Sequence, residues 1–399
     1  MSDEAAPTQQ SGTSRLAITL VAIAAAGLSL TMIQSVSDIV GPVFLSLNLL
    51  ITTYPIFLIL RRKGVPAGIA SVAAGAAVFV ILGVMLWAMS WSISAMVNEL
   101  SANASKFQAL YSDTLDWLGK LGFDSSSLVG QLKSISPASI LSVAGSILNN
   151  ASWVAGVIIT IATALIFMVM DQSSMEERLA IIRDSHPRVA RSFRSFVVGV
   201  RSYWLVTTVF GLIVAVLDGF ALWALGVSLP ITWAIVAFIT NYIPNIGFVI
   251  GVIPPALIAL VENGPWTALW VIVIYSVLNF VIQSIIQPRV TGDAVGLTAT
   301  MSFISLLLWA WVLGAIGALV ALPATLLVKC LLIDPDPKAR WVNAIIASNP
   351  DTARDEIEEL EAEDAAATQD DAANPQTDDI VLVIIEDERP AADNAVSEQ

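Results

Sequence analysis

Polar residues that could hold a solute gather around a proline inside a long apolar run. The run extends from Leu229 to Val261, and near its middle reads Asn241-Tyr242-Ile243-Pro244-Asn245-Ile246-Gly247. Proline lacks an N–H and clashes with the preceding turn, while glycine lets backbone or a ligand approach closely, so a helix is expected to break there. Backbone freed at membrane depth must be buried in protein or line a watery cavity. We therefore predict a substrate site that includes Asn241, Tyr242, Pro244, Asn245 and Gly247, with a kink that serves only packing as the alternative.

A second set of polar side chains lies on the next apolar segment. Asn279, Gln283 and Gln287 are spaced i, i+4, i+8, which predicts one line along a helix, and Ser276 extends that line. Amide groups in an apolar span need hydrogen-bonding partners. If the partner is a ligand, these groups suit a neutral polyol or a furanone-like cargo. If the partner is another helix, the amide groups instead hold neighbouring helices together.

One carboxylate lies well inside a predicted membrane span. Asp218 is followed by Gly219 in the segment Tyr203 to Leu225. A carboxylate inside a membrane is costly and is a functional candidate by default. Asp218 is thus the candidate for carrying a coupling proton or sodium ion. Because the outer end of the span is near, an interfacial carboxylate is the equal alternative.

The composition indicates a polytopic helical membrane protein. Hydrophobic residues make up 56% of the chain and charged residues 13%, against about 25% charged residues in soluble domains. Cys330 and His186 are single residues of their type, so no disulfide within the chain and no histidine-based metal site can form. The sequence has no Walker pattern, nucleophile triad or metal-ligand cluster. We expect no enzyme activity, no cofactor and no nucleic-acid partner.

About eight membrane segments are predicted between residues 15 and 333, the expected transporter domain. They are Leu16–Met32, Gly41–Leu60, Val65–Met89, Trp153–Met170, Tyr203–Leu225, Leu229–Val261, Trp266–Ile286 and Thr298–Leu332. Residues 1–14 are expected to be a disordered N-terminus, residues 92–151 an extracytoplasmic helical insertion, and residues 171–201 a basic cytoplasmic loop that forms a short helix pair. The basic loop either sets topology or also contacts anionic lipid headgroups.

Two of these segments are too long for one upright span. Leu229–Val261 and Thr298–Leu332 have 33 and 35 residues, whereas about 20 cross a bilayer. The second contains Leu313-Gly314-Ala315-Ile316-Gly317, and each run has a later proline, Pro254 or Pro323. We predict two re-entrant hairpins, with inverted repeats as one arrangement. The alternative is that both runs cross the membrane completely. Basic residues, including Arg61-Arg62-Lys63 and Arg289, favour the hairpins and place both termini in the cytoplasm.

The C-terminal part of the chain differs in composition from the rest. Residues 351–399 contain 17 acidic and 2 basic residues, while the remainder contains 16 acidic and 17 basic residues. The net charge of −14 therefore comes from the tail. Residues 334–399 are predicted to be an acidic disordered tail. Within it, Ile380–Ile385 is a candidate strand for a partner protein's sheet edge, or an apolar patch kept soluble by its acidic flanks.

These motifs resemble a known family of membrane permeases. Asn241 to Gly247 with Gly251 and Pro254, then Gln287-Pro288-Arg289-Val290-Thr291-Gly292 with Gly296-Leu297, and finally Gly314, Gly317 and Pro323 are similar to the signatures of the bacterial autoinducer-2 exporter family. The resemblance covers roughly Arg15 to Ile333. Where members often have a proline soon after the Gly-Leu pair, this chain has Thr298-Ala299-Thr300, which puts the substrate in question rather than the fold.

The resemblance implies a secondary transporter in the bacterial inner membrane. It implies a homo-oligomer that exports a small polar signal molecule, such as autoinducer-2, to the outside. Other members of the family resemble sodium/proton antiporters, so a monovalent cation/proton antiporter is the alternative function. A scaffold that recruits partners through the acidic tail is a third reading.

Overall fold

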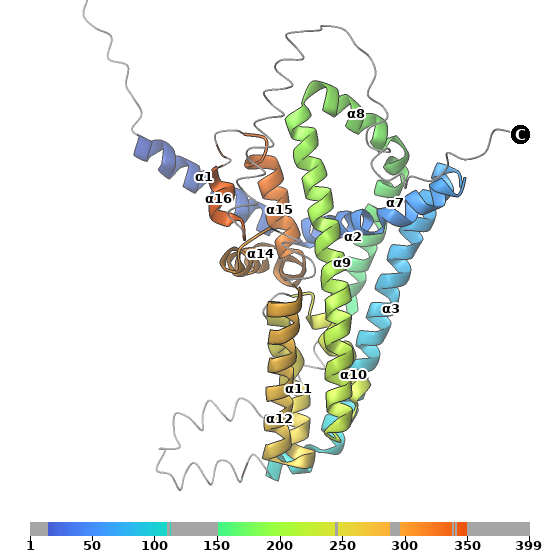
Figure 1. The fold of residues 1–399 in the computed structure, drawn as a ribbon, viewed down its shortest axis with the longest axis vertical. Helices are drawn as coiled ribbons and strands as arrows, with labels where there is room; N and C mark the ends of the chain where they lie inside the picture. Colours follow the sequence, from blue (N-terminus) through green and yellow to red (C-terminus); the bar gives the residue numbers. More distant parts are fainter. Residues whose placement is uncertain are drawn as a thin grey trace, which may run out of the picture.

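The chain folds into long helices arranged around one central helix, α9. The computed structural model describes residues 15–109, 112, 151–243, 246–287, 296–336, 339 and 341–348. The helices are α1 Arg15–Ser35, α2 Ser37–Arg62, α3 Ala67–Ala102, α7 Ala151–Asp171, α8 Met175–Ser185, α9 Pro187–Ala224, α10 Pro230–Thr240, α11 Ile246–Asn263, α12 Pro265–Asn279, α14 Ala299–Leu319, α15 Ala321–Leu332 and α16 Trp341–Ile346 (Figure 1). A 3₁₀ turn, Gln172–Ser174, precedes α8, and a π-helical turn, Phe280–Ile286, continues α12.

The fold class is that of an all-α polytopic membrane protein. Seven of the described helices are long and apolar enough to cross a membrane, and three shorter apolar helices, Leu20–Ser35, Pro230–Thr240 and Ala321–Leu332, accompany them. Large apolar side chains such as Leu20, Trp87 and Trp266 are exposed on the outer faces. Such surfaces suit lipid as solvent, so the prediction of an all-α membrane fold is confirmed.

Prolines set the start of several helices, including two that position the candidate site. Pro187, Pro230 and Pro265 each occupy the first turn of their helix. Proline is favoured there because its fixed φ suits a helix and its missing N–H would have no partner in the helix. At the start of α14, the Thr298 hydroxyl caps the helix by accepting a hydrogen bond from the Met301 N–H at 3.2 Å.

The run Leu229–Val261 forms a helical hairpin. A Cβ added to Gly247 would collide with the Thr240 carbonyl, and one added to Gly251 would touch Thr240 and Ala237, so α11 turns back along α10. The two ends of the run meet at the end of α9, where the Ser228 hydroxyl donates to a Glu262 carboxylate oxygen at 2.9 Å. The hairpin prediction is confirmed for the fold of this run.

The run Thr298–Leu332 forms a second hairpin. Gly314 has a non-helical backbone with φ 65° and ψ −144°, and a Cβ on Gly317 would collide with the Trp309 carbonyl. The Ser305 hydroxyl donates across the hairpin to the Ala321 carbonyl at 2.8 Å. In the described residues, glycines lie at the turns of both runs, where the sequence predicts the breaks.

The two hairpins approach α9 from opposite ends. In the first hairpin, Asn241 packs near Gly211 and Ala234 packs against Gly219, in the C-terminal half of α9. In the second, Leu326 packs against Gly199 in the N-terminal half of α9. The view in Figure 1 shows α10–α12 and α14–α15 on opposite parts of α9. This arrangement agrees with inverted repeats, in which each hairpin enters from its own side of the membrane.

Two predicted boundaries differ from the structure. The span predicted to end at Met89 continues as one helix to Ala102, because no proline or glycine interrupts Ser92–Ala102, and Ser92, Ile93 and Leu100 are buried along it. Little of the predicted insertion 92–151 is described beyond α3.

The expected tail also starts later than residue 334. Ile346 packs in the buried core, its carbonyl accepts from the Thr298 N–H at 2.9 Å, and Ser348 donates to the Gly296 carbonyl. The stretch Trp341–Ala347 is apolar, but a sequence pattern alone does not show which distant residues such a stretch will contact. Residues 1–14 and 349–399, including Ile380–Ile385, lie outside the described residues.

Candidate functional site

A small cavity at the turn of the first hairpin brings together polar residues from four helices. Its lining residues are Val214 and Asp218 of α9, Ala237 of α10, Asn241 at the end of α10, Gly247, Phe248 and Gly251 of α11, and Tyr275 and Asn279 of α12. The cavity has room for about one water molecule or a small cation. Four residues predicted as candidates, Asn241, Gly247, Asn279 and Asp218, thus lie around one space.

Asp218 is the charged group of this cavity. Its side chain is 1% exposed, and within the described residues its Oδ1 atom has no hydrogen-bond partner. Asp218 is thus covered by α10 and α12, which pack on this side of α9, while its depth in the membrane stays a prediction. An isolated ionised carboxylate is very costly to bury, so a proton or a cation must accompany Asp218 here.

Three amide side chains form a network beside Asp218. The Gln283 Nε2 atom donates to Asn241 Oδ1 at 2.7 Å and to Asn279 Oδ1 at 2.9 Å. The Asn279 Nδ2 atom donates to the Tyr275 carbonyl at 2.9 Å. Gln283 therefore links the end of α10 to α12. Gln283 and Asn279 of the predicted stripe thus join helices in this structure, and Asn279 also lines the cavity.

Glycines of α9 explain how the polar residues come so close. A Cβ on Gly211 would stand 2.9 Å from Asn241 Nδ2, and one on Gly219 would stand 2.9 Å from the Ala234 Cβ. A methyl group on Gly211 would displace the Asn241 amide, and one on Gly219 would push α10 away from α9, so either would disturb the approach of Asn241 to Asp218. Gly219, the residue after Asp218, serves close packing of α9 against α10.

Two further predicted residues, Tyr242 and Gln287, do not line the cavity. Tyr242 is buried against Trp204 and Phe238, and its hydroxyl lies 2.8 Å from that of Thr208. Gln287 is half-buried beyond the cavity, since the wider π-helical turn that holds Gln283 rotates later residues away from the predicted line. Pro244 and Asn245 lie outside the described residues.

Sequence reasoning missed Tyr275. Its side chain is 1% exposed, and in the part of the chain that the structure describes its hydroxyl has no hydrogen-bond partner. Ser276, which was expected to extend the stripe, is exposed and donates to the Ile272 carbonyl at 2.7 Å. Tyr275, Asn279 and Gln283 follow the i, i+4, i+8 spacing, so extending that line by four residues instead of three would have found Tyr275.

Comparison with known proteins agrees with this arrangement. The sequence profile described as AI-2E family transporter matches residues 16–334. The chain belongs to the AI-2E transporter family. It is similar to a protein of Haemophilus influenzae named only as a transport protein, with 29% identity over 81% of this chain and 94% of that protein. It is also similar to the AI-2 transport protein TqsA of Escherichia coli, with 28% identity over 75% of this chain and 87% of TqsA.

Membership in the AI-2E transporter family fits the geometry of the site. A helical hairpin with its turn beside a buried carboxylate is an arrangement that secondary transporters use to hold solutes and ions. The family match spans both hairpins and every residue that lines the cavity. Membrane transport is therefore the general activity of this protein.

Gln283→Ala is expected to weaken solute binding. The substitution removes two hydrogen bonds that fix the Asn241 and Asn279 amides. At about 0.5–1.5 kcal/mol for a lost hydrogen bond, the apparent affinity should fall about two- to thirteenfold. The measurement is solute transport as a function of concentration. Ser284→Ala, at the exposed next residue, is the control and should transport normally. Lower thermal stability with unchanged affinity would show that the network serves packing alone.

Proposed function

We propose that this AI-2E transporter exports a small polar organic solute, such as the autoinducer-2 signal molecule, across the bacterial cytoplasmic membrane. The observation that carries the proposal is the cavity at the turn of the first hairpin, where the Asp218 carboxyl, the Asn241 and Asn279 amides and the Tyr275 hydroxyl meet. These groups suit a neutral solute rich in hydroxyl groups, together with a proton or sodium ion. The printed name of TqsA, an AI-2 transport protein, supports this choice of solute.

Transport of an organic solute through this site requires the first hairpin to move. It has room for about one water molecule, so an organic solute can enter only if the hairpin moves relative to α9 or α12. The hairpin is attached to α9 through small residues, Gly211 and Gly219, whose contacts can slide. We infer that the solute binds between the Pro244–Gly247 turn and the Asn279–Gln283 side of α12, and that hairpin movement exposes it to one side of the membrane and then the other.

The positions of the basic residues indicate how the protein is oriented in the membrane. We place Arg61-Arg62-Lys63 and the α8–α9 turn in the cytoplasm, together with both termini. The ends of the first hairpin, at Ser228 and Glu262, then face outward. A homo-oligomer, which the family resemblance implies, stays a prediction.

Transport by purified protein in proteoliposomes tests the function. Vesicles preloaded with autoinducer-2 should release it faster than protein-free vesicles, and an imposed proton or sodium gradient should change the rate. Exchange of sodium for protons without any effect of the solute would instead support a cation/proton antiporter. No flux of either kind would contradict the proposal of secondary transport.

A further inference from the structure

Tyr242 lies at the tip of the first hairpin, and its side chain contacts α9 instead of lining the cavity. Its ring packs against the Trp204 ring of α9, with the ring centroids 5.5 Å apart, and against the Phe238 ring of α10 at the same distance. Tyr242 is buried. The tip of the hairpin is thus held on α9 by a buried aromatic side chain.

Two hydrogen bonds also tie Tyr242 to α9. The Tyr203 hydroxyl donates to the Tyr242 carbonyl at 3.1 Å. The single proton of the Thr208 hydroxyl goes to the Trp204 carbonyl at 2.6 Å, so the Thr208 oxygen accepts from the Tyr242 hydroxyl, which lies 2.8 Å away. We call Tyr203, Thr208 and Tyr242 the tip contact.

The tip contact belongs to a different part of the core from the body of the hairpin. Ile258 of α11 and Val271 of α12 lie in one buried cluster. Tyr242 lies in another cluster, together with Trp204 of α9 and Trp309 of α14. Because closely packed cores resist internal rearrangement, the hairpin body and α12 are expected to move past α9 as one unit. Such a movement breaks the tip contact.

The contacts between the hairpin and α9 differ in kind. At Gly211 and Gly219 the two helices touch by close packing alone. Hydrogen bonds depend on distance and angle, so the tip contact fixes where the hairpin stands along α9. Both bonds join neutral groups, whose net stabilisation is modest because water can replace the partner when the cavity opens. The tip contact can therefore break and form again in each transport cycle.

We propose that Tyr242 is a positioning residue that locks the first hairpin on α9 while the cavity is closed. This lock rests on the proposed function, because it acts on the hairpin movement that transport requires. Release of the Tyr242 hydroxyl from Thr208 lets the hairpin leave α9 and opens the cavity around Asp218. Tyr242 thus controls access to the site without touching the solute.

Chemical labelling of a cysteine inside the cavity tests the lock. In a Cys330→Ala background, Val214→Cys places a thiol at a buried position that lines the cavity. Its rate of reaction with a small water-soluble methanethiosulfonate in nanodiscs reports opening of the cavity. Tyr242→Phe removes the hydroxyl but keeps the ring, and Thr208→Val removes the acceptor. Each should raise the labelling rate about two- to thirteenfold, the change in open population expected for one lost hydrogen bond.

Three further variants separate the lock from a general loosening of the fold. The double variant Tyr242→Phe/Thr208→Val should label no faster than the faster single variant, since all of them lack the same bond. Thr208→Ser keeps the hydroxyl and should label at the rate of the Val214→Cys parent. Tyr54→Phe makes the same chemical change in a separate cluster, where Tyr54 stacks on Phe57, and should also keep the parent rate.

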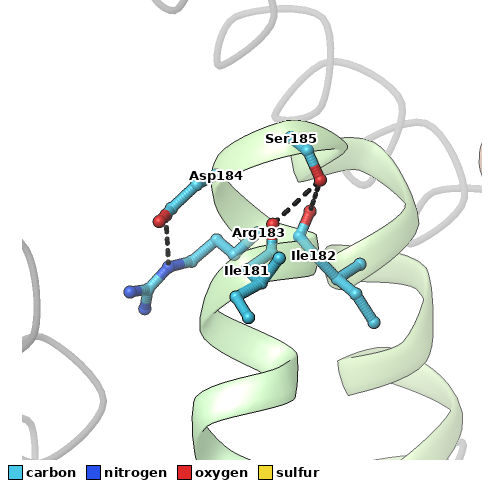
Figure 2. Close-up of polar contacts among 5 residues, drawn as sticks. All are labelled: Ile181, Ile182, Arg183, Asp184 and Ser185. Atoms are coloured by element: carbon cyan, nitrogen blue, oxygen red, sulfur yellow. Dashed lines mark hydrogen bonds and ion pairs between the residues drawn. The ribbon is translucent and has the colours of Figure 1, made fainter.

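Ser185→Cys is the control for the reagent. Ser185 is exposed at the end of α8, where Figure 2 shows its hydroxyl bonded to the Ile181 carbonyl of its own helix at 2.8 Å. A cysteine at this position should label equally fast in every background.

Two results would overturn the lock. The first is equal labelling of Val214→Cys with and without the Tyr242→Phe and Thr208→Val changes, because the hairpin would then stay on α9 when the cavity opens. The second is an equal rise in Tyr54→Phe. Labelling needs no solute, so a failure to transport autoinducer-2 would contradict the proposed function and leave the lock standing.

Discussion

Asp218→Asn is expected to uncouple transport from its driving gradient while leaving solute exchange intact. Asparagine keeps the size and polarity of the side chain but cannot carry a proton or balance a cation. Asp218 is 1% exposed and faces a cavity shared with Asn241, Asn279 and Tyr275. Because the buried carboxylate needs a counter-charge, its loss removes the ion from the transport cycle.

The measurement compares two modes of transport in the same proteoliposomes. Gradient-driven flux should fall at least about tenfold, as expected when an essential intramembrane carboxyl is lost, while solute-for-solute exchange should stay within about twofold. Glu177→Gln, the same chemical change at an exposed position of α8, is the control and should retain gradient-driven flux. An Asp218→Asn protein that still responds fully to both gradients would show that the coupling group lies elsewhere.

Gly247→Ala is expected to disrupt the first hairpin and with it transport. A methyl group at this position would collide with the Thr240 carbonyl, which is backbone and cannot rotate away. The turn would have to open, and Asn241 would leave its place beside Gln283. Overpacking typically costs about 1–3 kcal/mol, and a collision with backbone should lie at or above the upper end, so we expect a melting temperature lower by about 5–10 °C.

Gly83→Ala is the matched control for this experiment. Gly83 lies inside α3, and nothing lies within 4 Å of an added Cβ. Since alanine favours a helix over glycine, this variant should be neutral or slightly more stable. Gly317→Ala, whose methyl group would meet the Trp309 carbonyl, should behave like Gly247→Ala and extend the result to the second hairpin. Wild-type melting temperature and transport in Gly247→Ala would contradict the tight turn.

The sequence by itself determined the class of this protein and the places where its long runs break. The apolar composition with few charges indicates a chain that lies in lipid. There, helices provide the hydrogen bonds that the backbone N–H and C=O groups need. Proline and glycine act locally, so the break at Pro244–Gly247 and the interruption at Gly314–Gly317 could be predicted without knowledge of neighbouring helices. The residue types also identified Asp218, Asn241 and Asn279 as costly groups in a membrane.

Only the tertiary structure decided which of these groups meet. Asp218 and Asn241 come together because Gly211 and Gly219 let α10 approach α9, a contact between segments that no local pattern encodes. The π-helical turn at Phe280–Ile286 ended the predicted stripe before Gln287, and the packing of α12 put Tyr275 rather than Ser276 at the cavity. Ile346 likewise joined the core through a long-range contact with Thr298. Periodicity gives the side of a helix on which a residue lies, but the neighbour on that side is set by how the helices pack.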